Sequence, residues 1–255
     1  QVMPVLAKEL ESQENGEQLA TCTRALRQAM VHGADNAALV KEAQPLVEGC
    51  FGSALGSDDH EVLRAALDSL KTLALQSPGY VQAVAPVLVA RLCKVTERKR
   101  ERKVKFGPFT HIVDDEEPVR FIAYECLKAL YRFVPAGAVL ETLLDRLIAG
   151  LADGHNNALL CFSAFCDVCS SPSSSVLLEK VEPAVAALEK HLVRELSKNA
   201  VKQDVDRHQE LVAATLRAVR VLAQVHGVDR NASFQVFMRE TVQSGVHKAA
   251  YEALL

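Results

Sequence analysis

The chain has 255 residues, of which 49% are hydrophobic and 24% are charged, and its formal net charge is −3. This length is enough for a sizeable core or for several stacked repeats, and the composition is ordinary for a globular protein. A slightly acidic chain does not bind nucleic acid through its overall charge. No run of about 20 uncharged apolar residues is present, so we expect no membrane partner.

The cysteines are odd in number, seven in all, and most of them fall within helical patterns. This usage is typical of buried, reduced thiols in an intracellular protein, and we expect a cytoplasmic and nuclear location. The chain begins with Gln1 instead of an initiator Met, so we expect it to be a fragment or a processed form of a longer protein.

Apolar residues recur along most of the chain at the spacing of one helix face. The predicted helices follow one another about every 20 residues and are separated by short turns such as 77–79 and 170–175. Three predicted stripes, in chain order, are Leu63, Ala66, Leu67, Leu70 and Leu73; Ile122, Ala123, Cys126, Leu127 and Leu130; and Leu143, Leu147, Ile148 and Leu151.

The helices repeat in pairs. Aspartates precede three predicted helices, at Asp58-Asp59, Asp114-Asp115 and Asp153-Gly154, and the first aspartates of these turns are 56 and 39 residues apart. Removing a 17-residue insertion at 97–113 makes both spacings 39. Pro45 and Pro86, 41 residues apart, are expected early in the second helix of a pair. A period near 40 is typical of HEAT or armadillo repeats, and aspartates before helices are expected to cap them.

We therefore predict an all-α fold, an α-solenoid of HEAT/ARM-like helix pairs with one inserted β-hairpin. Residues 1–255 are expected to form a single array, with a broad concave surface, that is the C-terminal fragment of a longer protein. The alternative is an irregular all-α domain.

The inserted segment 97–113 carries a strand pattern on both sides of a turn. Gly107 and Pro108 supply the reversal, and apolar residues alternate with polar ones before and after it. An isolated two-stranded hairpin is marginal in water, so it either packs on the repeats or is ordered by a partner. The alternative is a disordered loop between two helices.

A basic run precedes the turn, because residues 98–105 contain six basic side chains and one acidic one. Such a run is found in nucleic-acid or nuclear-import patches. It lacks the interleaved aromatic residues of a base-stacking surface, so we favour a solvated helix end that leads into a strand.

Two blocks resemble the C-terminal region of the cullin-associated, neddylation-dissociated proteins, long HEAT-repeat exchange factors for cullin–RING ubiquitin ligases. The first is 107–115 followed by the helix 121–127, and the second comprises 178–183, 198–204, 209–211 and 216–219. The resemblance extends over roughly 55–255, and its most specific part is the Gly107-Pro108-Phe109 turn with Asp114-Asp115.

The resemblance implies a non-enzymatic, cullin-binding function with no cofactor. Proteins of this family wrap an unmodified cullin, and their C-terminal repeats hold its N-terminal repeats. A projecting hairpin enters the site used by the substrate-receptor adaptor, so that binding promotes adaptor release. Binding also blocks attachment of the ubiquitin-like modifier, that is, neddylation.

Carried over by position, the resemblance assigns partner binding to the hairpin. In the family the first strand tends to carry glutamates, whereas here lysines flank Val104, so the apolar members Phe106, Phe109 and Ile112 are the favoured contacts. The complete predicted set is Lys103, Val104, Lys105, Phe106, Gly107, Pro108, Phe109, Thr110, His111, Ile112 and Val113.

The sequence offers little that is typical of catalysis or metal binding. Cys166 and Cys169 have Cys-x-x-Cys spacing, but no second ligand pair accompanies them, so we interpret them as core thiols. We predict no catalytic, cofactor-binding or metal site. The main alternative function is a generic α-solenoid scaffold or transport adaptor that binds an acidic partner or nucleic acid through the basic insertion. An enzyme is a more distant alternative.

Overall fold

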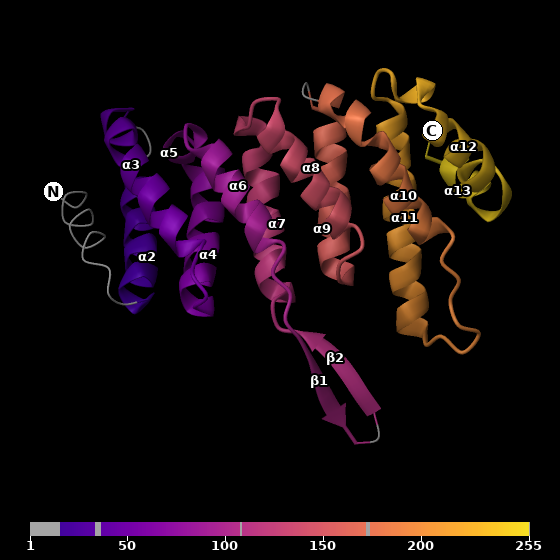
Figure 1. Cartoon of the computed structure of the whole chain (residues 1–255), viewed down its shortest axis with the longest axis horizontal. Helices are drawn as coiled ribbons and strands as arrows, with labels where there is room; N and C mark the ends of the chain where they lie inside the picture. The colour runs from indigo at the N-terminus through magenta and orange to yellow at the C-terminus, as the bar shows by residue number, and fades with distance from the viewer. Residues whose placement is uncertain (1–15, 34–36, 108, 172–173, 255) are drawn as a thin grey trace. The chain divides into compact units, whose positions relative to one another are not determined.

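The computed structural model describes residues 16–33, 37–107, 109–171 and 174–254. Helices dominate these residues, and the strands they contain form one two-stranded antiparallel sheet (Figure 1). The predicted α-helical repeat architecture with an inserted hairpin is confirmed. The chain divides into two compact units, residues 1–135 and 136–255.

In the first unit, α4 packs against α2 on one side and α7 on the other, and α6 packs against α3 and α7. The elements of this unit are α2 (Gly16–His32), α3 (Ala37–Ala54), α4 (His60–Gln76), α5 (Gly79–Gln82), α6 (Ala85–Val95), β1 (Glu101–Phe106), β2 (Phe109–Asp114), α7 (Glu117–Leu130) and the 3₁₀ turn η1 (Tyr131–Phe133).

In the second unit, α9 packs against α8 and α11, and α10 packs against α11 and α12. Its elements are α8 (Ala138–Gly150), α9 (His155–Cys169), η2 (Ser174–Lys180), α10 (Val181–Leu192), α11 (Lys202–Ala223), η3 (Val228–Arg230), α12 (Ala232–Phe237), the π-helical turn η4 (Met238–Val242), η5 (Gly245–His247) and α13 (Lys248–Glu252).

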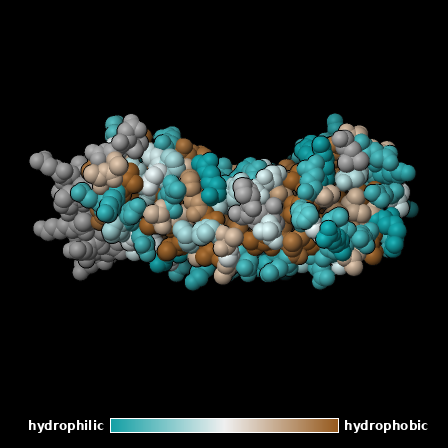
Figure 2. Space-filling model, turned by 90° about the horizontal axis from the view of Figure 1, so that it is seen from above, coloured by the Kyte–Doolittle hydropathy of each residue, from teal (hydrophilic) through white to brown (hydrophobic). Residues whose placement is uncertain are grey.

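The apolar stripes form the helix contacts. All five residues of the α4 stripe are fully buried, and the α8 stripe is buried as well. Ile122 of the α7 stripe is only half-buried. Burying a leucine side chain contributes about 2 kcal/mol, so these stripes account for the side-by-side packing of α4 with its neighbours. Exposed apolar residues are dispersed, and hydrophobic and hydrophilic residues intermingle on the face seen in Figure 2.

Two of the three aspartate caps were predicted wrongly. Asp59 caps α4 as expected, because its carboxylate accepts hydrogen bonds from the N–H groups of Glu61 and Val62. The N-caps of α7 and α9 are instead Glu116 and Gly154, which make no side-chain capping bond. The Asp114 carboxylate before α7 instead contacts the Arg120 side chain and the N–H of Arg100, which directly precedes β1.

The proline register was only partly right. Pro86 lies in the first turn of α6, as predicted, where its missing N–H is not needed. Pro45 lies in the middle of the 18-residue α3, not near its start. The turn at 77–79 is confirmed, since α4 ends at Gln76. Among the described residues, no helix is long and apolar enough to cross a membrane.

Candidate protein-binding hairpin

The hairpin is closed by a turn that requires glycine. Phe106 pairs with Phe109 in the antiparallel register, which leaves Gly107 and Pro108 as a two-residue connection. Gly107 has φ +59°, and a Cβ added there would meet nothing within 4 Å. The requirement for glycine is therefore conformational and not steric crowding, because a left-handed backbone disfavours other residues. The predicted reversal between the two strands is confirmed by this pairing, whereas Pro108 itself lies outside the described residues.

The register sorts the strand residues onto two faces. Lys103 pairs with Ile112 and Lys105 with Thr110, and these four residues share one face because side chains alternate along a strand. The opposite face carries the pair Val104 and His111 and the pair of Arg102 and Val113. Each face therefore combines cationic and apolar side chains.

Most of the predicted contact residues are exposed to solvent. Ile112 is 65% exposed, a high value for a large apolar side chain, and Val104 is half-buried. Residue 108 and the side chains of residues 106 and 109 lie outside the described part, so their predicted contacts stay predictions. The other predicted residues are exposed, namely Lys103, Lys105, Gly107, Thr110, His111 and Val113.

The two strands pair with each other and extend away from the helices. Figure 1 shows the hairpin projecting beyond the ends of α4 and α7, and among the described elements no helix packs extensively along either strand. Both outer strand edges are consequently unpaired within the described chain. An isolated two-stranded hairpin is marginal on its own, so its position depends on how its root is held.

An ion pair and three hydrogen bonds hold the root. The Asp114 Oδ2 and Arg120 Nη1 atoms are 2.7 Å apart, and these side chains are only 12% and 5% exposed. Asp114 Oδ1 accepts hydrogen bonds from the N–H of Arg100, at 2.9 Å, and of Glu116, at 3.1 Å. The N–H of Asp115 donates to the Arg100 carbonyl at 3.0 Å. These contacts tie both strands to the start of α7.

The environment of Asp114 favours its ionised form. Burial by itself raises the pKa of this carboxyl, but the hydrogen bonds from the Arg100 N–H, from Arg120 and from the Glu116 N–H, together with the Arg120 charge, outweigh it. The net effect is a pKa below the usual value for aspartate. The root is therefore built on a carboxylate that stays charged at neutral pH.

Arg98 extends the root to the neighbouring helix pair. Its Nε lies 3.2 Å from Glu116 Oε2, its Nη1 donates to the Ser57 carbonyl at 2.8 Å, and its own carbonyl accepts a 2.8 Å bond from Arg120 Nη1. The Glu116 side chain is 6% exposed and is also 2.7 Å from His60 Nε2. We call the set Arg98, Asp114, Glu116 and Arg120 the root cluster.

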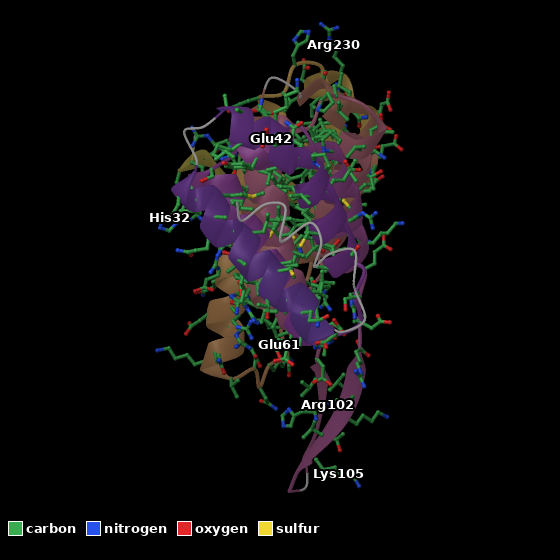
Figure 3. All side chains as sticks on the ribbon, turned by 90° about the vertical axis from the view of Figure 1, so that its left-hand side faces the viewer. His32, Glu42, Glu61, Arg102, Lys105 and Arg230 are labelled. Atoms are coloured by element: carbon green, nitrogen blue, oxygen red, sulfur yellow. The ribbon has the colours of Figure 1, made fainter. Side chains whose placement is uncertain are left out.

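Ion pairs engage half of the basic residues in the run 98–105. Besides Arg98, two more of the six basic residues form ion pairs, since Lys99 lies 2.8 Å from Glu101 and Arg102 Nε donates to both Asp115 oxygens at 2.8 Å. Figure 3 shows Arg102 near the root and Lys105 near the tip. The strand lysines that form no ion pair with a described residue, Lys103 and Lys105, therefore lie closer to the tip than Arg102 does.

The match to known families covers the hairpin and most of the helices. Residues 79–242 match the family TIP120, described as TATA-binding protein interacting (TIP20). The chain belongs to this family. The TIP120 match begins within the first unit, at the start of α5, and extends to the end of η4 in the second.

Similar proteins bear names that agree with the predicted resemblance. The chain is 32% identical to Cullin-associated NEDD8-dissociated protein 1 of Arabidopsis thaliana over 196 residues, 73% of this chain and 15% of that protein. Identity to the Dictyostelium discoideum protein of the same name is 29%, over 80% of this chain and 17% of the relative. A C-terminal part from Emericella nidulans is 25% identical over 71% of this chain and 18% of the relative.

These relatives confirm the resemblance to the C-terminal region of the cullin-associated proteins. The chain spans less than a fifth of the length of each of them.

The sequence-based reasoning missed the root cluster. The signal was present at Arg120, which lies three residues before Ala123 on the buried face of α7 and is itself buried. A charged residue within an apolar stripe predicts a buried partner of opposite charge, and Asp114 is that partner.

The Cys-x-x-Cys pair lies at the C-terminal end of α9. Cys169 is buried, Cys166 is half-buried, and neither forms a disulfide. Burial, with the nearby Cys166, raises the pKa of the Cys169 thiol. A thiol that resists ionisation is a poor nucleophile and a poor metal ligand, in agreement with a packing role.

Proposed function

We propose that this chain is the cullin-binding C-terminal part of a non-enzymatic exchange factor and that its partner is the N-terminal repeats of an unmodified cullin. Two observations support the proposal. The chain belongs to the TIP120 family, and relatives that match most of it bear the name Cullin-associated NEDD8-dissociated protein 1.

The hairpin, on this proposal, is the element that competes with the substrate-receptor adaptor. The observation that carries it is the exposed position of Lys103, Lys105 and Ile112 on strands that pack on no described helix, combined with a root held by buried charges. A hairpin with a fixed root presents its side chains in a defined direction, which lowers the entropic cost of binding. Competition at this site would regulate ligase assembly and, with it, neddylation.

One pull-down experiment tests both cullin binding and competition with the adaptor. The chain is immobilised and offered unmodified cullin N-terminal repeats, with and without the adaptor. We expect the cullin to be retained and the adaptor to weaken its retention, because two ligands that share a site destabilise each other reciprocally. Retention that saturating adaptor does not weaken would refute the competition.

A shortened hairpin tests the role of the strands without disturbing the root. Replacing residues 103–112 by Asn-Gly joins Arg102 to Val113 through a two-residue turn and keeps the register pairs of Arg102 with Val113 and Glu101 with Asp114. We expect this variant to bind the cullin repeats while displacing the adaptor less. Equal displacement of the adaptor by the variant and by the original chain would refute the role of the hairpin in competition.

The alternative of a scaffold that binds an acidic partner or nucleic acid rests on the same exposed lysines. It predicts that affinity depends steeply on salt and falls when Lys103 and Lys105 are changed to glutamine. The cullin proposal predicts a smaller salt effect and a larger loss on Ile112→Asp, since desolvated apolar anchors carry more binding energy than rim charges. Measuring cullin affinity at several salt concentrations with both variants separates the two functions.

A further inference from the structure

The outer edge of β1 offers backbone groups to a further strand. The N–H of Asp115 donates to the Arg100 carbonyl at 3.0 Å, and these two residues continue the register of the hairpin. In an antiparallel ladder, hydrogen-bonded pairs alternate with pairs whose N–H and C=O groups point away from the neighbouring strand. Counted from the pair of Arg100 with Asp115, the outward-pointing groups of β1 include those of Lys103 and Lys105. The described sheet has two strands, so these groups have no ladder partner within it.

The side chains add positive charge to the same edge. Lys103 and Lys105 are exposed, lie two residues apart on one face of the hairpin, and form no ion pair with a described residue. Their cross-strand neighbours on β2, Ile112 and Thr110, are uncharged. Ile112 is exposed and lies beside Lys103, so it offers an apolar contact on that face. The open edge of β1 therefore combines two cations with unused hydrogen-bonding groups of the backbone.

The two lysines select the kind of strand that can pair with this edge. A second copy of β1 would bring lysines close to lysines, and like charges on neighbouring strands destabilise the pairing. An extended segment with acidic residues at alternate positions places a carboxylate opposite each lysine, which stabilises both cross-strand pairs. The residue between the two acids falls on the opposite face, beside the half-buried Val104, where an apolar side chain fits best.

We propose that the outer edge of β1 binds an extended acidic–apolar–acidic segment of a partner protein, which adds to the hairpin as a third strand. Backbone hydrogen bonds to Lys103 and Lys105 hold the segment, and its two carboxylates pair with their ammonium groups. The outer edge of β2 exposes the backbone groups of Thr110 and Ile112, which carry no charge that selects a particular strand. The inference rests on the proposed function, in which the hairpin binds a partner, and adds the kind of segment that this partner contributes.

The test uses the complete ¹⁵N-labelled chain and the capped peptide Thr-Val-Glu-Val-Glu-Val-Thr, with amide hydrogen exchange followed by NMR. We expect exchange to slow at Lys103 and Lys105, whose N–H groups gain an acceptor, and to change little at Val104, whose N–H already faces β2. The same peptide with both glutamates N-methylated keeps its charge but cannot donate hydrogen bonds to β1. We therefore expect the N-methylated peptide not to bind.

Charge variants test the side-chain contacts. We expect Lys103→Gln and Lys105→Gln each to raise the Kd of the peptide about threefold and the double variant to raise it about tenfold, the values for one and two cross-strand charge pairs. Lys202→Gln, at an exposed lysine at the start of α11, is the matched control for loss of one charge and should leave the Kd unchanged. Circular dichroism checks that each variant is folded.

Slowed exchange at Lys103 and Lys105 that the N-methylated peptide does not produce supports strand addition at β1. Failure of the original peptide to bind overturns it, as does equal binding of the N-methylated peptide or an equal loss with Lys202→Gln, since either indicates attraction by charge alone. Slowed exchange at Thr110 and Ile112 instead overturns the assignment to β1. Cullin retention without peptide binding refutes strand addition alone, whereas peptide binding without cullin retention supports strand addition and refutes the cullin as partner.

Discussion

Removing the Asp114 carboxylate should destabilise the hairpin root far more than an ordinary surface change. In Asp114→Ala, Arg120 loses its ion-pair partner while remaining only 5% exposed, and the N–H groups of Arg100 and Glu116 lose their acceptor. Breaking a buried pair from one side costs about 3–5 kcal/mol. Because Asp114 is 12% exposed and lies near the surface, we expect about 3 kcal/mol.

The partner substitution makes the reasoning quantitative. Arg120→Met removes the charge and keeps much of the side-chain length, so we expect it to cost about 2 kcal/mol. The double variant should cost about 2 kcal/mol less than the two single changes added together, because neither charge then remains unpaired. Costs that add to within about 0.5 kcal/mol would show that the two side chains do not stabilise each other and would refute this account of the root.

The assay must report on the first unit. Since the chain forms two compact units, unfolding in urea is best followed by hydrogen exchange at the amides of α7 and the strands, which assigns the loss to the root. The pKa of Asp114 is lower in the folded state than in the unfolded chain, so its contribution is present above about pH 4 and is lost as the pH falls through the lowered value. The coupling between Asp114 and Arg120 should therefore vanish in strong acid.

Three further predictions concern the core, the turn and pH. Leu70→Ala, at a fully buried position of α4, should lower the free energy of unfolding by about 2–5 kcal/mol. Leu75→Ala, at a 60% exposed position of the same helix, should change it by less than about 0.5 kcal/mol. Urea titration measures both values, and equal losses would contradict the packing described for α4. Gly107→Ala should destabilise the hairpin by about 1 kcal/mol because φ at this position is +59°, and it should leave α7 unaffected. Hydrogen exchange should then become faster at the strand amides and not in α7. Unchanged exchange at the strand amides would contradict the prediction. Burial, with the nearby positive charges of Arg194 and His208, lowers the pKa of His191, so the unfolded chain binds the proton more readily and stability should fall as the pH drops below about 6.5. Urea unfolding of the second unit over this pH range should show a shallower dependence for His191→Gln, and an unchanged slope would show that another group is responsible.

The helices were predictable because their buried contact residues recur in the sequence at the spacing of one helix face. The stripe from Leu63 to Leu73 marks one face of α4, and burial of that face requires neighbours on both sides. The hairpin was predictable for a local reason, since Gly107 permits the turn and the flanking alternation sets the strands. Neither inference needs knowledge of residues distant in the sequence.

The root cluster was not predictable in the same way because it depends on distant partners. The sequence pattern indicated that Asp114 caps α7, which is the ordinary role of an aspartate before a helix. In the structure its carboxylate is engaged by Arg120 and by the N–H of Arg100, fourteen residues earlier, and it leaves the N-cap position to Glu116. Propensity describes a residue with its neighbours, whereas a buried charge is placed by whatever cation the fold brings to it.

The way in which the hairpin is attached has a consequence for how such a chain can diverge. The side chains of Lys103, Lys105, Thr110, His111 and Ile112 are exposed, so substitutions at these positions need not be compensated elsewhere in the first unit. The charge of the strands can therefore change separately from the stability of the helices, and substitution of either lysine should cost little in stability. The same separation makes the segment a natural position for grafting a new recognition sequence, provided that the turn glycine, Arg98, Asp114 and Arg120 are retained.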